Sequence, residues 1–361
     1  MLRVVTWNVL AQELLQYFWR SSYGLPLLSP SSSLPPGAPN TYASLTAIRM
    51  TNVVNILRDL KPDILLLQET SDTVHSCLGN RTVARFIADE LSLTIAGESF
   101  KGSCFEFSEP PFEQSRGSRM DSGVATLYNT RKVDHLAILA RAESEGRCEL
   151  FRSGFGSPFT ADSFRIKQST ITTTTTTILS PSDGRVNIEK ISGSASGGGG
   201  GGGGGGNSVG TVTIVNIHVR MQFPNIKAPL ADVFERLARA GVGVGESGWK
   251  RTIVAGDLNA GGISSAPDLA AVQPSGLIDV FSGAPPADDR VLVGTAVRVR
   301  KALVANNVPL LAMGTGAGMS GSQWSKAETK YTINLSNKVL LETKTMSSDH
   351  LPLIIDIDLE E

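Results

Sequence analysis

The chain has 361 residues, of which 41% are hydrophobic and 19% are charged. This is enough apolar material for a large core, and it excludes a chain that is disordered throughout. Because the net charge is −1, composition gives no general attraction to nucleic acid or to an anionic membrane, and an anionic substrate has to be held by a local site.

Strand and helix patterns alternate along the chain. Residues 2–7 form a β-rich run, and residues 46–60 have apolar side chains at helical spacing, including Ile48 and Val53. The further predicted elements are strands over 64–67, 123–128, 211–217, 252–255 and 353–357, and helices over 83–91 and 230–240. This alternation favours an α/β or α+β sandwich with its sheets inside.

Two segments have the composition of loops. Residues 28–40 are rich in proline and serine, and residues 172–210 contain a threonine run at 172–177 and a glycine run at 197–206. A glycine run cannot bury side chains and loses the most entropy on ordering. We expect insertions within one catalytic domain over residues 1–361, with a domain boundary as the alternative.

The cysteines and the hydropathy give weaker expectations. Cys77, Cys104 and Cys148 lack metal-ligand spacing, so we expect neither a disulfide framework nor a zinc knuckle, and we expect a reducing, intracellular location in the cytoplasm, nucleus or mitochondrion. No stretch approaches the roughly 20 consecutive apolar residues of a membrane span. His75 and His135 stand apart from other polar motifs and are expected at the surface.

Polar residues follow the predicted buried strands. They are Asn8, Glu69, His218 and Asp257, with Asn259 two residues further on, and Asp349-His350 stands just before the last strand. Strand ends at one rim of a sheet are where open sheets place their sites.

These residue types suit metal-assisted hydrolysis of a phosphoester. Glu69 and Asp349 are hard oxygen ligands of the kind that Mg²⁺ or Mn²⁺ prefers, and zinc is disfavoured because no cysteine joins them. Asp257 is suited to orienting or deprotonating water, and imidazoles and a carboxamide can hold phosphate oxygens as charge accumulates.

In this order, the motifs resemble the endonuclease/exonuclease/phosphatase superfamily, from near the first strand to the last. The motifs are Trp7-Asn8, Gln68-Glu69, Asn216-Ile217-His218, Gly256-Asp257-Leu258-Asn259 and Ser348-Asp349-His350. The resemblance implies a four-layer sandwich of two packed β-sheets flanked by helices.

The same resemblance implies a role for each site residue. Asn8, Glu69 and Asp349 match metal-site positions, with Glu69 as the principal ligand. The matching catalytic positions are those of His218, Asp257, Asn259 and His350. We take Asp257 as the base.

The segments Asn8–Gln12 and Ser348–Leu353 resemble the deadenylase-like branch, which includes carbon catabolite repressor 4-type domains, nocturnin and the Angel proteins. This favours a Mg²⁺-dependent 3′ exoribonuclease with RNA as its partner. The alternatives are a DNA-repair nuclease, an inositol, lipid or nucleotide phosphatase, or a catalytically weak scaffold or RNA-binding subunit.

The low-complexity insertion 172–210 and one departure from the family pattern motivate the last alternative. The family carries an acid just before a tyrosine that supports the terminal histidine, and the nearest counterpart is Lys330-Tyr331. A lysine there would leave His350 poorly oriented unless Asp279, Asp288 or Asp289 replaces the acid. Residues 314–321 also lack aromatic side chains for stacking bases, which argues against poly(A) preference.

Overall fold

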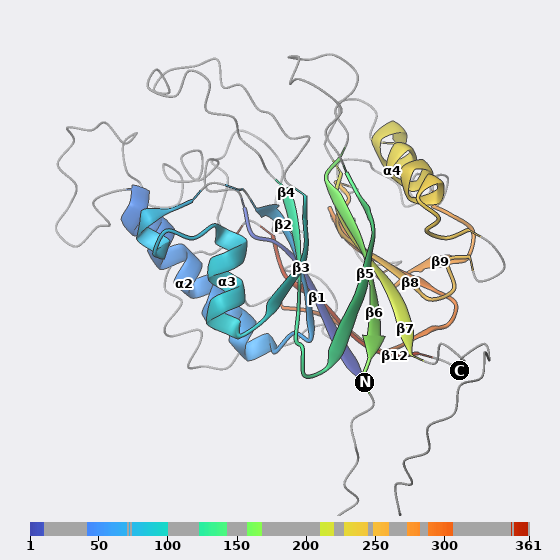
Figure 1. The fold of residues 1–361 in the computed structure, drawn as a ribbon, viewed down its shortest axis with the longest axis horizontal. Helices are drawn as coiled ribbons and strands as arrows, with labels where there is room; N and C mark the ends of the chain where they lie inside the picture. Colours follow the sequence, from blue (N-terminus) through green and yellow to red (C-terminus); the bar gives the residue numbers. More distant parts are fainter. Residues whose placement is uncertain are drawn as a thin grey trace, which may run out of the picture.

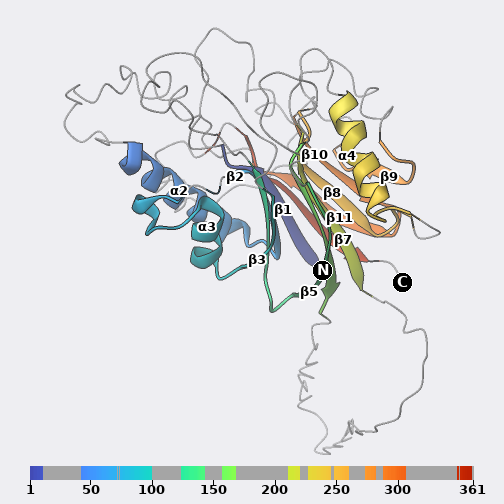
Figure 2. The same cartoon turned by 45° about the horizontal axis from the view of Figure 1, so that its top comes forward.

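Two β-sheets face each other and helices cover both outer faces (Figures 1 and 2). The computed structural model describes residues 1–10, 42–70, 72, 74–99, 123–142, 157–167, 210–219, 227–244, 248–259, 273–281, 288–305, 348 and 350–359. The four layers of the sandwich confirm the predicted fold class.

The first sheet has six strands in the order β11-β12-β1-β2-β4-β3. Their bounds are β1 Leu2–Asn8, β2 Ile64–Thr70, β3 Thr94–Ser99, β4 Gly123–Tyr128, β11 Val297–Val304 and β12 Leu353–Leu359. Helices α2 (Tyr42–Leu60) and α3 (Val83–Leu91) cover its outer face, and a short 3-10 helix, η2 (Ser76–Leu78), precedes α3.

The second sheet has the order β5-β6-β7-β8-β10-β9. Its strands are β5 Val133–Arg141, β6 Phe159–Ile166, β7 Thr211–His218, β8 Thr252–Asp257, β9 Leu277–Asp279 and β10 Asp289–Gly294. Helix α4 (Lys227–Arg239) lies on its outer face.

Each sheet contains one parallel pair, and these two pairs place the site. Strand β1 runs parallel to β2 with Asn8 opposite Gln68, and β7 runs parallel to β8 with His218 opposite Asp257. The carboxyl ends of all four strands therefore reach the same rim of the sandwich. The sequence pattern of polar residues at strand ends is thus a spatial cluster.

Apolar burial between the layers explains why these segments take these positions. The strand run Ile64–Leu67 is fully buried because it is covered by α2 on one side and by the second sheet on the other. On α2, Val53 and Leu57 are fully buried. Ile48, predicted on the same apolar face, is instead 40% exposed.

The low-complexity segments 28–40 and 172–210 lie outside the described residues, apart from Gly210. Strands β6 and β7, which flank the longer segment, pair directly with each other from Phe159 to Arg165. Ile166 N–H also donates to Gly210 O at 2.8 Å. The chain between them therefore leaves and rejoins the same sheet at adjacent positions.

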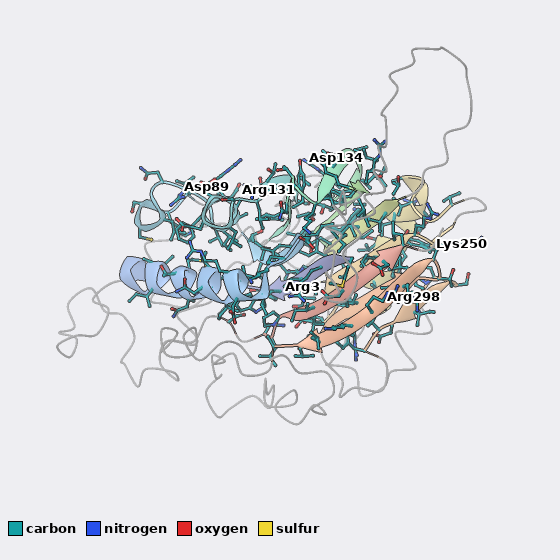
Figure 3. The ribbon with its side chains drawn as sticks, turned by 90° about the horizontal axis from the view of Figure 1, so that it is seen from below. Arg3, Asp89, Arg131, Asp134, Lys250 and Arg298 are labelled. Atoms are coloured by element: carbon teal, nitrogen blue, oxygen red, sulfur yellow. The ribbon has the colours of Figure 1, made fainter. Side chains whose placement is uncertain are left out.

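Seen from the end opposite the rim, the labelled side chains are of both signs: basic Arg3, Arg131, Lys250 and Arg298, and acidic Asp89 and Asp134 (Figure 3). Arg3 makes a bidentate pair with the buried Asp356 of β12, at 2.7 and 2.9 Å. Among the described helices, none is long and apolar enough to cross a membrane.

Gly256 is predicted to be irreplaceable, because its φ is +144° and a Cβ there would lie 1.9 Å from the Ile217 carbonyl oxygen. Gly256→Ala should lower the free energy of unfolding by about 4 kcal/mol or more, the size associated with severe steric faults. Gly241→Ala is the matched control, since φ is +84° with nothing within 4 Å of its Cβ, and strain alone should cost about 1–3 kcal/mol. Urea denaturation measures both, and equal losses would contradict the clash.

Candidate active site

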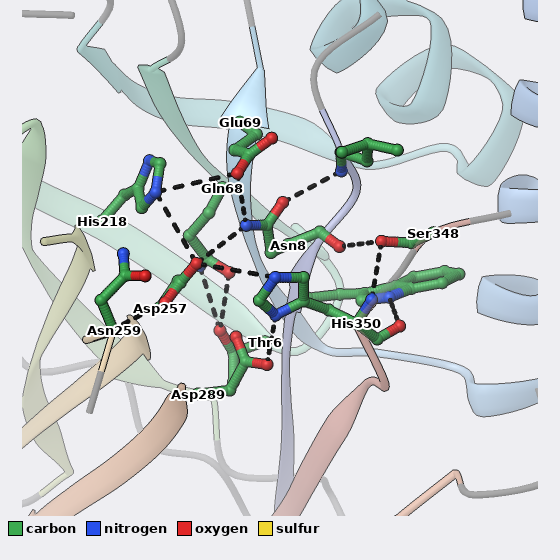
Figure 4. A network of polar contacts seen from close by, with 12 residues as sticks. Thr6, Asn8, Gln68, Glu69, His218, Asp257, Asn259, Asp289, Ser348 and His350 are labelled. Carbon is green, nitrogen blue, oxygen red and sulfur yellow. Dashed lines mark hydrogen bonds and ion pairs between the residues drawn. The ribbon is translucent and has the colours of Figure 1, made fainter. Parts of the chain in front are cut away.

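The rims of the two sheets meet in a network of polar side chains (Figure 4). Strands β1 and β2 of the first sheet and β7, β8 and β10 of the second contribute to it, together with the segment that leads into β12. The residues brought together are Asn8, Glu69, His218, Asp257, Asn259, Asp289 and His350. Six of them were predicted from the sequence as site residues; the seventh predicted residue, Asp349, lies outside the described residues.

Asn8 joins two of the three acidic side chains of the network. Its Nδ2 donates to Glu69 Oε1 and to Asp257 Oδ2, each at 2.9 Å. Its Oδ1 accepts from Leu10 N–H at 3.0 Å, which determines which end of the amide faces the carboxylates. Asn8 is fully buried and holds a carboxylate of each sheet with one amino group.

The backbone after β1 is held from outside the sheet. Arg49 of α2 is 1% exposed; it donates to Val9 O and, at 2.7 Å, to Leu10 O. Leu10 itself has a positive φ of 58°. This bracing keeps the Leu10 amide pointed at Asn8.

Glu69 projects from a bulge in β2. Gln68 pairs with Val124 and Thr70 pairs with Gly123, so Glu69 is the extra residue in the ladder. Its φ of 57° is left-handed, a conformation that costs a non-glycine residue about 1–3 kcal/mol. A bulge re-aims the side chain next to an active site, and here it turns Glu69 toward Asn8.

Asp257 lies between two imidazoles. Its Oδ2 is 3.7 Å from His218 Nε2 and 3.8 Å from His350 Nε2, and His218 Nε2 is also 3.9 Å from Glu69 Oε1. These distances exceed hydrogen-bond length. The two imidazoles and the two carboxylates are therefore near neighbours that do not bond one another directly. His218 Nδ1 is buried and has no hydrogen-bond partner among the described residues.

Asn259 shapes the turn that follows β8. Its N–H donates to Asp257 Oδ1 at 2.8 Å, its Nδ2 donates to Val219 O, and its φ is 49°. An aspartate that accepts from the backbone two residues on forms an Asx turn. The turn fixes the Asp257 carboxylate with Oδ2 toward the imidazoles.

His350 is oriented by Asp289, the first residue of β10. The His350 Nδ1 to Asp289 Oδ2 distance is 2.8 Å, and an acceptor at Nδ1 leaves Nε2 facing Asp257. Ser348 Oγ donates to Asn8 O at 2.6 Å and accepts from His350 N–H at 3.2 Å. Trp7 Nε1 donates to His350 O at 2.9 Å.

An acid that supports the terminal histidine is therefore present: of the three acids that the sequence offered as replacements, Asp289 lies beside His350. Asp289 precedes Arg290 and not a tyrosine, so the acid–tyrosine signature pointed to the wrong segment; Lys330 itself lies outside the described residues. Of the other two candidate acids, Asp279 faces Arg290 at 3.6 Å, and the Asp288 carbonyl accepts from Leu258 N–H. The register of β10 against β8, with Asp289 opposite Asp257, explains the choice.

Burial raises the pKa of Asp289 to about 7, and the neighbouring His350 opposes this rise. The cause is the loss of hydration of the charged carboxylate. Its other oxygen, Oδ1, is buried without a hydrogen-bond partner among the described residues. The Asp289 carboxyl group is therefore poorly hydrated, and His350 Nδ1 is its hydrogen-bond partner.

Two overlapping groups of side chains have ligand atoms close enough to hold a metal ion. They are Glu69, His218 and Asp257, and Asp257, Asp289 and His350, with the atoms of each group within 4.8 Å of one another. Carboxylate oxygens dominate both groups, which fits a hard divalent cation. Asn8 lies against the first group as a hydrogen-bond donor in this arrangement.

The two remaining histidines in the chain were predicted at the surface and are partly buried. His135 Nε2 pairs with the fully buried Asp162 at 3.0 Å, and its ring packs against Phe164 with centroids 5.2 Å apart. His75 is half-buried, and burial, with a contribution from Arg49, lowers its pKa.

A four-layer sandwich with acids and imidazoles at the strand ends defines a metal-dependent phosphoester hydrolase. Residues 5–350 match the model of the Endonuclease/Exonuclease/phosphatase family, and the chain belongs to that family. No curated protein sequence is significantly similar to the chain.

Solved structures share the fold at low identity. The structure of ANGEL2, a 2′,3′-cyclic phosphatase, with adenosine-2′,3′-vanadate has 12% identity and a TM-score of 0.53 and covers 100% of this chain and 96% of that one. The human Nocturnin catalytic domain with bound sulfate has 16% identity, a TM-score of 0.49 and coverages of 99% and 93%. TDP2 of D. rerio with a single-strand DNA product has 11% identity, a TM-score of 0.45 and coverages of 99% and 98%.

The raised pKa of Asp289 predicts a pH dependence of stability. Its folded-state pKa is about 7 against an ordinary 3.8, so the stabilisation by its proton is complete below the ordinary value and is lost as pH rises to about 7. In EDTA, the free energy of unfolding of the wild type should therefore fall relative to Asp289→Asn across this range. Urea denaturation at several pH values measures it.

Asp358→Asn is a control of opposite sign. The hydrogen bond from Arg300 and the amino terminus lower the pKa of Asp358, so the wild type should gain stability over this variant as pH rises through the acid range. A wild-type curve parallel to that of Asp289→Asn would contradict the raised pKa.

Proposed function

We propose that the chain is a Mg²⁺-dependent phosphodiesterase that removes nucleotides from the 3′ end of RNA. The observation that carries the hydrolytic chemistry is the convergence of Glu69, Asp257, His218 and His350 on one point at the meeting of the two sheets. The motif resemblance at Asn8–Gln12 and Ser348–Leu353 supports RNA 3′ ends as the substrate.

The charge of the site supports a cation. Among the described residues, the partners of Asp257 and Asp289 are carboxamide, imidazole and backbone groups, with no lysine or arginine. A phosphodiester would be repelled by this set unless a divalent ion compensates the carboxylates. Glu69 and Asp257 would hold that ion, and Mg²⁺ suits their oxygens, with Mn²⁺ as a substitute. When bound, it polarises a phosphoryl oxygen and steadies the leaving group.

The chain's own residues supply the remaining functions. Asp257 is held by Asn8 and by the Asn259 turn so that Oδ2 can orient water and accept its proton. His350, with Nδ1 on Asp289, and His218 present their Nε2 atoms toward the same point, where they can donate to phosphate oxygens.

RNA ending in a 2′,3′-cyclic phosphate is a second candidate substrate, because a 2′,3′-cyclic phosphatase shares the fold with a TM-score of 0.53. DNA and small phosphoesters are further alternatives from the sequence. The scaffold alternative loses one of its two motivations, since Asp289 supplies an acid beside His350. Its other motivation, the low-complexity insertion 172–210, lies outside the described residues apart from Gly210.

Removal of either metal-side carboxylate is expected to abolish cleavage. Glu69→Gln and Asp257→Asn should lower kcat about 10³-fold or more with Mg²⁺, because each removes charge that both holds the cation and places water. A 3′-labelled RNA assay with and without EDTA measures this. Glu90→Gln is the control, since Glu90 pairs with Arg58 on the exposed helix face. Cleavage unaffected by both site variants or by EDTA would refute the proposal.

A substrate panel separates the candidates. Single-stranded RNA with a free 3′ hydroxyl, the same RNA with a 2′,3′-cyclic phosphate, the matching DNA and a 5′-labelled copy should be compared at one Mg²⁺ concentration. The proposal expects mononucleotide release from the 3′ end of the first RNA at the highest kcat/KM. A preference for the cyclic phosphate or for DNA would contradict the proposed substrate, and the proposed metal-dependent hydrolysis would still stand.

A further inference from the structure

The reacting groups are divided between two sheets that pack face to face. Asn8 and Glu69 belong to the first sheet, and His218, Asp257 and Asp289 belong to the second. Apolar packing between sheets is not directional, so the hydrophobic core alone does not specify how far one sheet slides over the other. A slide of one residue would move the groups about 3.3 Å apart.

A row of polar contacts crosses the sandwich and ties five strands or strand ends of the first sheet to the second. In the order of the strands, the ties are His350–Asp289, Asn8–Asp257, Gln68–Asn216, Thr126–Thr160 and Ser99–Ala142. They join β12 to β10, β1 to β8, β2 to β7, β4 to β6 and β3 to the end of β5. The first two ties are the site itself, and the third has no part in the chemistry.

The third tie is the most extensively bonded. Gln68 Nε2 donates to Asn216 Oδ1 at 2.7 Å, and Asn216 Nδ2 donates across the interface to Leu67 O and Ala125 O at 3.1 and 2.9 Å. Gln68 Nε2 also contacts Thr6 Oγ1 at 3.0 Å. Gln68 and Asn216 are fully buried, so any displacement of one sheet would leave amide groups without partners, at a high cost.

The two residues also stand next to the site along the chain. Gln68 immediately precedes Glu69 on the bulged strand, and Asn216 lies two residues before His218 on β7. Both belong to the motifs that the family resemblance rests on, yet neither faces the point where the acids and imidazoles converge.

We propose that Gln68 and Asn216 are positioning residues that hold the two sheets in the register in which Glu69 meets Asp257 and His218. This rests on the proposed hydrolytic function of that site. Loss of the tie should weaken metal binding and turnover together, whereas loss of an equally buried tie farther from the site should affect neither.

The test compares two shape-conserving pairs. Gln68→Met with Asn216→Leu removes the tie beside the site, and Thr126→Val with Thr160→Val removes the next one, whose two side chains are also fully buried. Apolar groups of similar shape limit the loss of packing. Each double variant also removes a donor that other buried groups use, since Asn216 donates to Leu67 O and Ala125 O and Thr160 hydrogen-bonds Asp162. Gln68→Met alone keeps the Asn216 bonds to Leu67 and Ala125 while Asn216 Oδ1 loses its donor, and it decides the outcome if the double variant does not fold.

The first measurement is the rise in melting temperature of the protein as Mn²⁺ is added without substrate. The second is kcat for RNA cleavage as a function of Mg²⁺ concentration. The Gln68 variants should raise the half-saturating metal concentration and lower kcat about 10–100-fold, with the Thr126/Thr160 variant within about threefold of wild type. Equal effects of both pairs, or unchanged metal dependence in the Gln68 variants, would overturn the inference. If the wild type binds Mn²⁺ and does not cleave RNA, the proposed function is refuted. The inference on Gln68 and Asn216 is then still tested by the metal dependence of the melting temperature.

Discussion

The amino group of Asn8 makes the interaction on which the rest of the site depends, because it bonds a carboxylate from each sheet at 2.9 Å. The Asn8 amino group can reach both carboxylates only if strands β1, β2 and β8 end at the same level of the sandwich. The parallel pairs provide that alignment, since parallel neighbours end on the same side. The strand order therefore determines the geometry of the site, because a sandwich with a different strand order would separate Glu69 from Asp257.

Strain accompanies this arrangement at several points. Leu10, Glu69 and Asn259 have positive φ values of 58°, 57° and 49°, and each flanks or belongs to the network. The surrounding contacts keep them there: Arg49 braces the Leu10 carbonyl, the bulge accommodates Glu69, and Asn259 bonds both Asp257 and Val219. Such clustering at a functional site is expected, because regular strands aim side chains up or down and not along the rim.

Much of this could be predicted from the sequence, and the exceptions have physical causes. Runs buried on both faces, such as Ile64–Leu67, are continuous apolar segments and are recognisable as strands. Strand β5 was missed because it lies at a sheet edge with Leu136 and Ile138 exposed and with two bulges, so its alternation is broken. Asp289 could not be distinguished from Asp288, since that choice depends on the register of β10 against β8.

The net charge of the chain is −1, and acidic side chains gather where the two sheets meet. At the opposite end, the labelled side chains carry both signs: Arg3, Arg131, Lys250 and Arg298 are basic, and Asp89 and Asp134 are acidic. Burial favours a proton on Asp289, whose pKa is about 7, and this partly relieves repulsion beside Asp257. Under the proposed function, a divalent cation would complete the compensation where Glu69 and Asp257 are close together. The metal site would then depend on the same inter-sheet register as the two hydrogen bonds of Asn8.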